Sequence, residues 1–164
     1  RTHEAEIAIR YGLDAKAWPR TEADRLAEVE MVPVVAPCLL AEGPPLTEPA
    51  GLLAHTLLHE DNRSAWQRWF TAAGLPGTAP GRAQIYTEGN LVLQAALHGQ
   101  GVALVDRLYA AADLAAGRLV QPFDLSIHDG AYWLVARSFK RLSPAAQAFR
   151  EWLLLRLRAD DGSG

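Results

Sequence analysis

The run of residues 95–104, AALHGQGVAL, places a helix, two glycines and a strand next to one another. The alanines and leucine at its start are strong helix formers, and Gly99 stands where a helix commonly ends on a left-handed residue. Gly101 then leads into residues 102–105, an unbroken apolar run that is typical of a strand covered on both faces. Because the glycines follow a helix instead of opening one, the run is not a phosphate-binding loop. It predicts a helix-to-strand connection of an α/β protein.

Strands and helices are expected to alternate along the rest of the chain. Apolar and β-branched runs predict strands at residues 6–11, 29–36, 55–59 and 131–137. Aromatic residues recur at helical spacing between Trp66 and Ala73, and Gly74 closes the helix that they predict. The alternation favours an α/β fold with mainly parallel sheets.

The end of the chain carries the clearest helix signal. Ser143 can cap this helix, and Pro144 suits its first turn. Apolar residues line one face of it: Ala145, Ala148, Phe149, Trp152 and Leu155. The polar residues 159–164 that follow are expected to form a disordered tail.

Several segments, taken together and in order, resemble one known family. They are AIRYG at 8–12, Trp18-Pro19, MVPVVAPCL at 31–39, LLH at 57–59, WQRWFTAAG at 66–74, the run at 95–104, DLAAGRLVQPF at 113–123, AYWLV at 131–135 and AFREWLL at 148–154. Their order and spacing resemble the C-terminal effector-binding domain of LysR-type transcriptional regulators. The resemblance is nearest to the branch that holds the glycine-cleavage activators and the β-lactamase regulators, and it runs along almost the whole chain.

The resemblance implies a two-lobed α/β fold of the periplasmic-binding-protein type, with two crossover strands joining the lobes. It assigns residues 1–33 to part of lobe I, 34–125 to lobe II and 126–158 to the return into lobe I. Pro33 cannot donate a backbone hydrogen bond, so it suits an edge or the crossing point between lobes. The matched domains carry a strand, a helix and a second strand before AIRYG. The first lobe is therefore expected to be incomplete and the chain to be truncated at its N-terminus.

The resemblance also implies a bacterial cytoplasmic sensor that binds a small-molecule effector between its lobes and forms a homodimer or homotetramer. DNA would be bound by a separate N-terminal helix-turn-helix. Composition agrees, because 16 Lys and Arg against 19 Asp and Glu give a net charge of -3, whereas DNA-binding surfaces usually carry a basic excess. No membrane span and no cofactor are expected. The single cysteine, Cys38, excludes an internal disulfide and fits a reducing compartment.

The first candidate effector contacts are Arg10, Tyr11 and Gly12, at the end of the first predicted strand. Ligands of α/β sheets commonly bind beyond the carboxyl ends of strands, where a guanidinium and a phenol can meet an anionic or polar molecule. The alternative is that Arg10 pairs with a surface carboxylate and Tyr11 packs between the lobes.

The second candidate group is Thr87, Glu88 and Gly89, just before a helix expected to start near Leu91. The alternative is that Thr87 or Asn90 only caps that helix. β-Lactamase regulators have serine in this loop, so Thr87-Glu88-Gly89 departs from their pattern.

Tyr132 matches a tyrosine that contributes to the effector pocket in the same branch of the family. An aromatic residue at the start of a strand is equally compatible with the hydrophobic core.

Two other classes of function remain as alternatives. A solute-binding protein of a transporter shares the two-lobed architecture, although no signal peptide or lipid-anchor cysteine is visible. An enzyme is not expected: His55 and His59 are four residues apart on a predicted strand, too far to share a metal, and no nucleophile elbow or phosphate loop is present.

Overall fold

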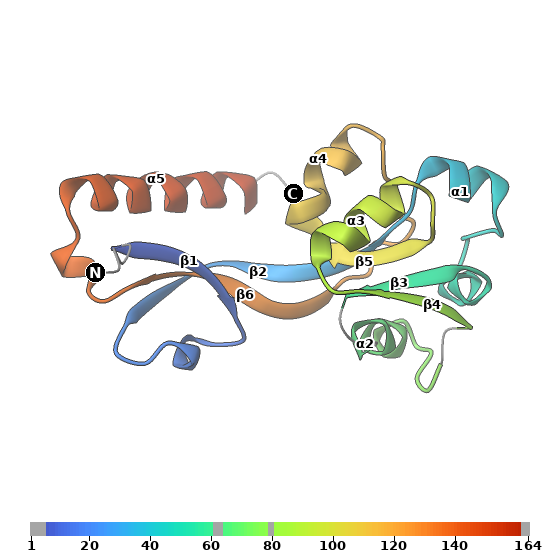
Figure 1. Cartoon of the computed structure of the whole chain (residues 1–164), viewed down its shortest axis with the longest axis horizontal. Helices are drawn as coiled ribbons and strands as arrows, with labels where there is room; N and C mark the ends of the chain where they lie inside the picture. The colour runs from blue at the N-terminus through green and yellow to red at the C-terminus, as the bar shows by residue number, and fades with distance from the viewer. Residues whose placement is uncertain (1–5, 61–63, 79–80, 162–164) are drawn as a thin grey trace. The chain divides into compact units, whose positions relative to one another are not determined.

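The computed structural model describes residues 6–60, 64–78 and 81–161. Strands and helices alternate along these residues (Figure 1). The strands are β1 (Ile7–Gly12), β2 (Glu22–Val34), β3 (Thr56–Glu60), β4 (Arg82–Tyr86), β5 (Val102–Asp106) and β6 (Ile127–Ala136). The α-helices are α1 (Pro37–Glu42), α2 (Ser64–Ala72), α3 (Gly89–Leu97), α4 (Arg107–Ala115) and α5 (Pro144–Asp161). Short 3-10 helices occur at Ala15–Ala17, Pro49–Ala54 and Phe139–Arg141.

The strands are hydrogen-bonded in the order β1-β6-β2-β5-β3-β4. β3 runs parallel to both β4 and β5, whereas β5 pairs antiparallel with β2, and β1 pairs antiparallel with β6. The α/β class is confirmed, but the sheet is mixed: the expectation of mainly parallel strands holds for β3, β4 and β5 alone. The antiparallel pairs involve the long strands β2 and β6, each of which has residues in both compact units of the chain.

The chain divides into two compact units. Unit 1 comprises Arg1–Val29 and Asp129–Gly164, and unit 2 comprises Glu30–His128. The divisions fall within β2 and β6, a few residues from the boundaries at 33 and 126 that the sequence suggests. Pro33, which pairs with Leu104, lies in the interior strand β2 close to the first division, so it is at a crossing point and not at an edge.

Unit 2 is a three-layer sandwich, with α3 and α4 on one face of the strands and α2 on the other (Figure 1). Successive residues of β5 point to opposite faces. Ala103 and Val105 pack with α3 and α4, while Val102 and Leu104 pack with the aromatic residues of α2. The predicted burial of this strand on both faces is therefore confirmed.

Helix α2 anchors the second core layer through buried aromatic side chains. The indole N–H of Trp66 donates to the carbonyl of Leu58 at 3.0 Å, and that of Trp69 donates to the carbonyl of Leu125 at 3.0 Å. Both rings thus bury a large apolar area while their polar atoms stay hydrogen-bonded. Gly74, with φ of +85°, ends the helical turn as predicted.

The glycine after α3 behaves as its sequence position predicts. Gly99 has φ of +71°, and the N–H of Gln100 donates to the carbonyl of Ala95 at 3.0 Å. This is the left-handed helix end that satisfies carbonyls of the last turn.

Unit 1 contains β1, the first part of β2, most of β6 and helix α5. Strand β2 begins at Glu22, seven residues earlier than the sequence suggests, because it is hydrogen-bonded in the sheet beside β6, a strand from much later in the chain. A charged residue near its start also has a distant partner. Arg150 of α5 donates two hydrogen bonds to Asp24, and its guanidinium lies 4.2 Å from the centroid of the Phe139 ring.

The N-terminus of α5 is capped as predicted. The N–H of Ala146 donates to the hydroxyl of Ser143 at 3.2 Å. Glu6 accepts two further hydrogen bonds from Ser143, which hold the pKa of this exposed carboxyl below its ordinary value. The expected tail begins at residue 159, whereas the helix continues to Asp161, and residues 162–164 lie outside the described residues.

The apolar face predicted for α5 points away from unit 1. The helix turns Ala146, Arg150 and Leu153 inward, whereas Phe149, Trp152 and Leu155 are 40%, 54% and 67% exposed. The covered stripe includes Arg150, which pairs with Asp24, so the more apolar stripe that the sequence singles out is not the covered one. No helix among the described residues is long and apolar enough to span a membrane.

Candidate functional site

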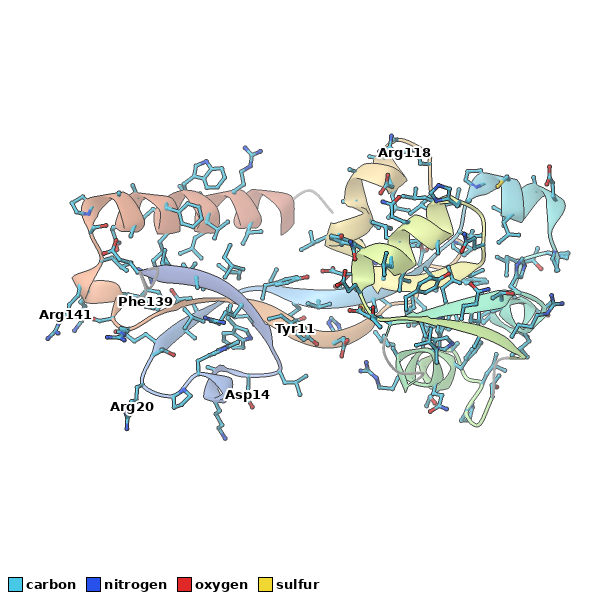
Figure 2. The ribbon with its side chains drawn as sticks, in the orientation of Figure 1. Tyr11, Asp14, Arg20, Arg118, Phe139 and Arg141 are labelled. Atoms are coloured by element: carbon cyan, nitrogen blue, oxygen red, sulfur yellow. The ribbon has the colours of Figure 1, made fainter. Side chains whose placement is uncertain are left out.

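Tyr11 and Tyr132 form a cross-strand pair in unit 1. They stand opposite each other in the register of β1 and β6, with ring centroids 6.1 Å apart in an edge-on arrangement. Tyr11, labelled in Figure 2, is 50% exposed, and its hydroxyl donates to the carbonyl of Asp129 at 2.7 Å. The structure therefore brings two predicted site residues, Tyr11 and Tyr132, together. The phenol of Tyr11 is held by its hydrogen bond to the backbone of β6.

Gly12 provides a close backbone approach beside this pair. Its carbonyl accepts a hydrogen bond from the indole N–H of Trp133 at 3.1 Å. A Cβ at Gly12 would lie 2.7 Å from the ring of Trp18, which is too close for any side chain. A glycine is thus needed here for packing, and its carbonyl is oriented by Trp133.

Arg10 lies apart from the phenol of Tyr11, although the two residues are neighbours in sequence. Successive side chains of a strand point to opposite faces, so Arg10 shares a face with its register partner Trp133 and not with Tyr11. The Arg10 side chain is exposed. The structure does not join its guanidinium to the tyrosine pair.

The second predicted group lies in unit 2, between β4 and α3. Glu88 occupies the cap position of α3, and its backbone carbonyl accepts from the N–H groups of Leu91 and Val92 at 3.1 and 3.3 Å. Its side chain makes no capping hydrogen bond. The alternative in which Thr87 or Asn90 caps the helix is wrong, because the cap residue is Glu88.

The loop before α3 is close to the end of β3. A Cβ built on Gly89 would lie 3.2 Å from a carboxylate oxygen of Glu60, the last residue of β3. The carboxyl ends of parallel strands β3 and β4 are therefore beside the N-terminus of α3, the place where α/β sheets commonly bind ligands.

Sequence reasoning missed Glu60, Asp129, Gly130 and Trp133. Glu60 could have been found from its position directly after the buried run of residues 57–59. The other three act through backbone groups or an indole N–H, and no local pattern signals those roles. The candidate residues fall into two sets, with Arg10, Tyr11, Gly12 and Tyr132 in unit 1 and Thr87, Glu88 and Gly89 in unit 2.

Two histidines of unit 2, His55 and His59, are buried inside the protein. His55 is buried, and its Nε2 lies 2.8 Å from the carbonyl of Pro44. His59 is buried in β3. Over residues 6–60, 64–78 and 81–161, no group of three or more His, Cys, Asp or Glu side chains is placed to hold a metal ion.

Comparison with known proteins gives one consistent result. A family model described as LysR substrate binding domain matches residues 1–158. The glycine cleavage system transcriptional activator of Escherichia coli (strain K12) is 36% identical over 158 residues, which are 96% of this chain and 51% of that protein. The AmpR transcriptional activator of Pseudomonas aeruginosa is 38% identical over 150 residues, 91% of this chain and 49% of the relative. The chain thus spans about half the length of these relatives.

Solved structures agree with the sequence comparison. The effector domain of AmpR from Pseudomonas aeruginosa has a TM-score of 0.80 at 35% identity, covering 94% of this chain and 73% of that one. The AmpR effector binding domain from Citrobacter freundii has a TM-score of 0.79 at 30% identity, covering 94% and 75%. These relatives are transcriptional regulators, which does not favour a transporter subunit. The chain belongs to the LysR substrate binding domain family.

Proposed function

We propose that this chain is the effector-sensing and oligomerisation domain of a LysR-type transcriptional regulator. The observation that carries the proposal is the family match over residues 1–158, and the named relatives are transcriptional activators. DNA binding would belong to a helix-turn-helix outside these residues. For the same reason we propose a cytoplasmic location, a homodimeric or homotetrameric regulator, and no enzymatic activity of the domain itself.

Both units are proposed to carry effector-binding residues. In unit 1 these are Tyr11, Gly12 and Tyr132, and in unit 2 they are Thr87, Glu88 and Gly89. Arg10 lies on the other face of β1, so we assign it a longer-range attraction for an anionic group. Residues 1–33 and 126–158 would then form lobe I, and 34–125 lobe II.

The chemistry of the two sets of candidate residues indicates the kind of effector. The Tyr11 hydroxyl donates a hydrogen bond to the carbonyl of Asp129, so its oxygen would act as an acceptor toward a further group. The N-terminus of α3 presents backbone N–H groups and a partial positive charge, which suit an anionic or carbonyl oxygen. We propose an effector that carries both a hydrogen-bond donor and an acceptor, as in an amino acid or a short peptide.

A thermal-shift screen of the full-length regulator tests this proposal directly. The compounds are amino acids, peptidoglycan fragments and small carboxylates, since a ligand at 100 times its dissociation constant adds about 2.7 kcal/mol of stability. An effector should also change the output of a reporter gene. If deleting this domain leaves the effector response of the reporter intact, the proposed function is wrong.

Conservative variants that remove one hydroxyl each test the residues. We expect Tyr132→Phe and Thr87→Ala to weaken the effector response at a stability cost of about 1 kcal/mol or less. Thr71→Ala is the matched control for Thr87→Ala, because Thr71 is an exposed threonine of α2 and belongs to neither candidate set. Normal responses from both site variants would contradict the site while leaving the family assignment intact.

A further inference from the structure

We infer that Gly130 is a positioning residue for the phenol of Tyr11, and that only a residue without a side chain at 130 keeps this phenol on the backbone of β6. The inference rests on the proposed function in one respect, since Tyr11 is one of its effector contacts. The geometry itself is independent of any ligand.

The backbone of Gly130 is left-handed where β1 stops pairing with β6. Its φ is +77°, a conformation that residues with side chains adopt rarely. The register of β1 and β6 ends at Gly12 opposite Ala131, so Gly130 is the next residue beyond it. The carbonyl of the preceding residue, Asp129, accepts the Tyr11 hydrogen bond at 2.7 Å. The left-handed residue thus adjoins the peptide group that holds the phenol.

The space beside Gly130 is filled by Tyr11. A Cβ at this position would lie 3.0 Å from the Tyr11 hydroxyl oxygen, 3.0 Å from its Cε2 and 3.0 Å from the carbonyl oxygen of Gly12. The Gly12 carbonyl is backbone and is bonded to the indole of Trp133, so it yields less readily than a half-exposed ring. A methyl group at 130 would therefore push the phenol away and weaken its hydrogen bond to Asp129.

The Tyr11 bond falls at the division of the chain in β6. His128 is the last residue of unit 2 and Asp129 is the first of this strand in unit 1. The carbonyl of His128 accepts from Arg68 of α2 at 3.2 Å, and the carbonyl of Asp129 accepts from Tyr11 of β1. Consecutive carbonyls are thus held by side chains of different units. A displaced phenol would therefore leave the carbonyl of Asp129, the first residue of β6 in unit 1, without its hydrogen bond from Tyr11.

Ring spectra of the tyrosines test the placement without an effector. The chain has four tyrosines, so ¹³C-labelled tyrosine gives few NMR signals, and Tyr11→Phe assigns the signal of Tyr11. We expect Gly130→Ala to shift the Tyr11 signals toward values of an unbonded, mobile phenol and to perturb those of the neighbouring Tyr132 ring, whose centroid is 6.1 Å away. Gly117→Ala is the matched control, because Gly117 has φ of +75° but nothing within 4 Å of an added Cβ. Unchanged Tyr11 signals in Gly130→Ala, or an equal shift in Gly117→Ala, would overturn the inference.

Thermal melts of a double-mutant cycle cover the case in which Gly130→Ala folds poorly. If the methyl group acts through Tyr11, Gly130→Ala lowers the melting temperature more in the wild-type background than in a Tyr11→Ala background. Gly117→Ala should lower it equally in both. A Gly130→Ala variant that stays unfolded even with Tyr11→Ala would show that the strain does not act through the phenol.

The effector response of the full-length regulator then separates this inference from the proposed function. Gly130→Ala and Tyr11→Phe should lose the response to a similar degree, while Gly117→Ala keeps it. Displaced Tyr11 signals with a normal response would retain the positioning role and remove Tyr11 from the proposed effector contacts.

Discussion

Glu6 accepts two hydrogen bonds from Ser143, one from its backbone N–H at 3.1 Å and one from its hydroxyl at 2.7 Å. The two residues are 137 positions apart. Their contact ties the start of β1 to the first turn of α5, so the charge of Glu6 is coupled to the folded state of unit 1.

This contact predicts a pH dependence of stability. The hydroxyl and backbone hydrogen bonds from Ser143 lower the folded-state pKa of Glu6 below the ordinary value of 4.5. Its stabilising contribution is therefore present above pH 4.5 and is lost as the pH falls through the folded-state pKa. We expect the difference in melting temperature between wild type and Glu6→Gln to shrink over that range. In a Ser143→Ala background the same difference should be small at every pH. With Ser143 present, a difference that does not change with pH would contradict the assignment.

Arg150 is predicted to stabilise unit 1 through its planar guanidinium. It donates from Nε and an Nη to one oxygen of Asp24 and stacks on Phe139, contacts that a lysine ammonium cannot reproduce together. We expect Arg150→Lys to cost about 0.5–1 kcal/mol in urea unfolding. Arg25→Lys, in an exposed pair with Glu28, is the control and should change stability little. Equal losses of unfolding free energy in the two variants would mean that stacking and burial of Arg150 contribute nothing to stability.

The exposed stripe of α5 and the edge strand β1 predict self-association of this chain. Phe149 and Trp152 form an exposed ring pair, and β1 is the terminal strand of the sheet, with Ile9 52% exposed. Exposed apolar faces and open strand edges favour association. We expect light scattering to show a dimer or larger species, and Trp152→Glu to reduce it. A wild-type monomer at high protein concentration would contradict this prediction.

The chain by itself is predicted not to recognise DNA. Its net charge of -3 gives little attraction for phosphates, whose neutralisation provides most non-specific affinity. A mobility-shift assay at physiological salt should show no sequence-dependent complex, with the full-length regulator as positive control. Tight binding of one operator by this chain would require a DNA-binding surface on its own residues.

Much of the local structure was predictable because its causes are local. The left-handed end of α3 at Gly99, the cap of α5 at Ser143 and the aromatic spacing of α2 depend on residues within one or two turns. The burial of β5 follows from its unbroken apolar run. For the candidate site, the sequence identified Tyr11, Gly12 and Tyr132, which the fold brings together, but not that Arg10 faces the other way.

Long-range contacts decided the rest. The charged start of β2 forms a strand beside β6, and its Asp24 pairs with Arg150, 126 positions later. Helix α5 turns inward the stripe that contains Arg150, the partner of Asp24, and leaves the more apolar stripe exposed, which helical periodicity alone does not predict. The same holds for Tyr11, whose bond to Asp129 spans 118 positions and needs a glycine at 130. Local sequence specifies backbone preferences, whereas the partner of a side chain is set by chain segments that only folding brings together.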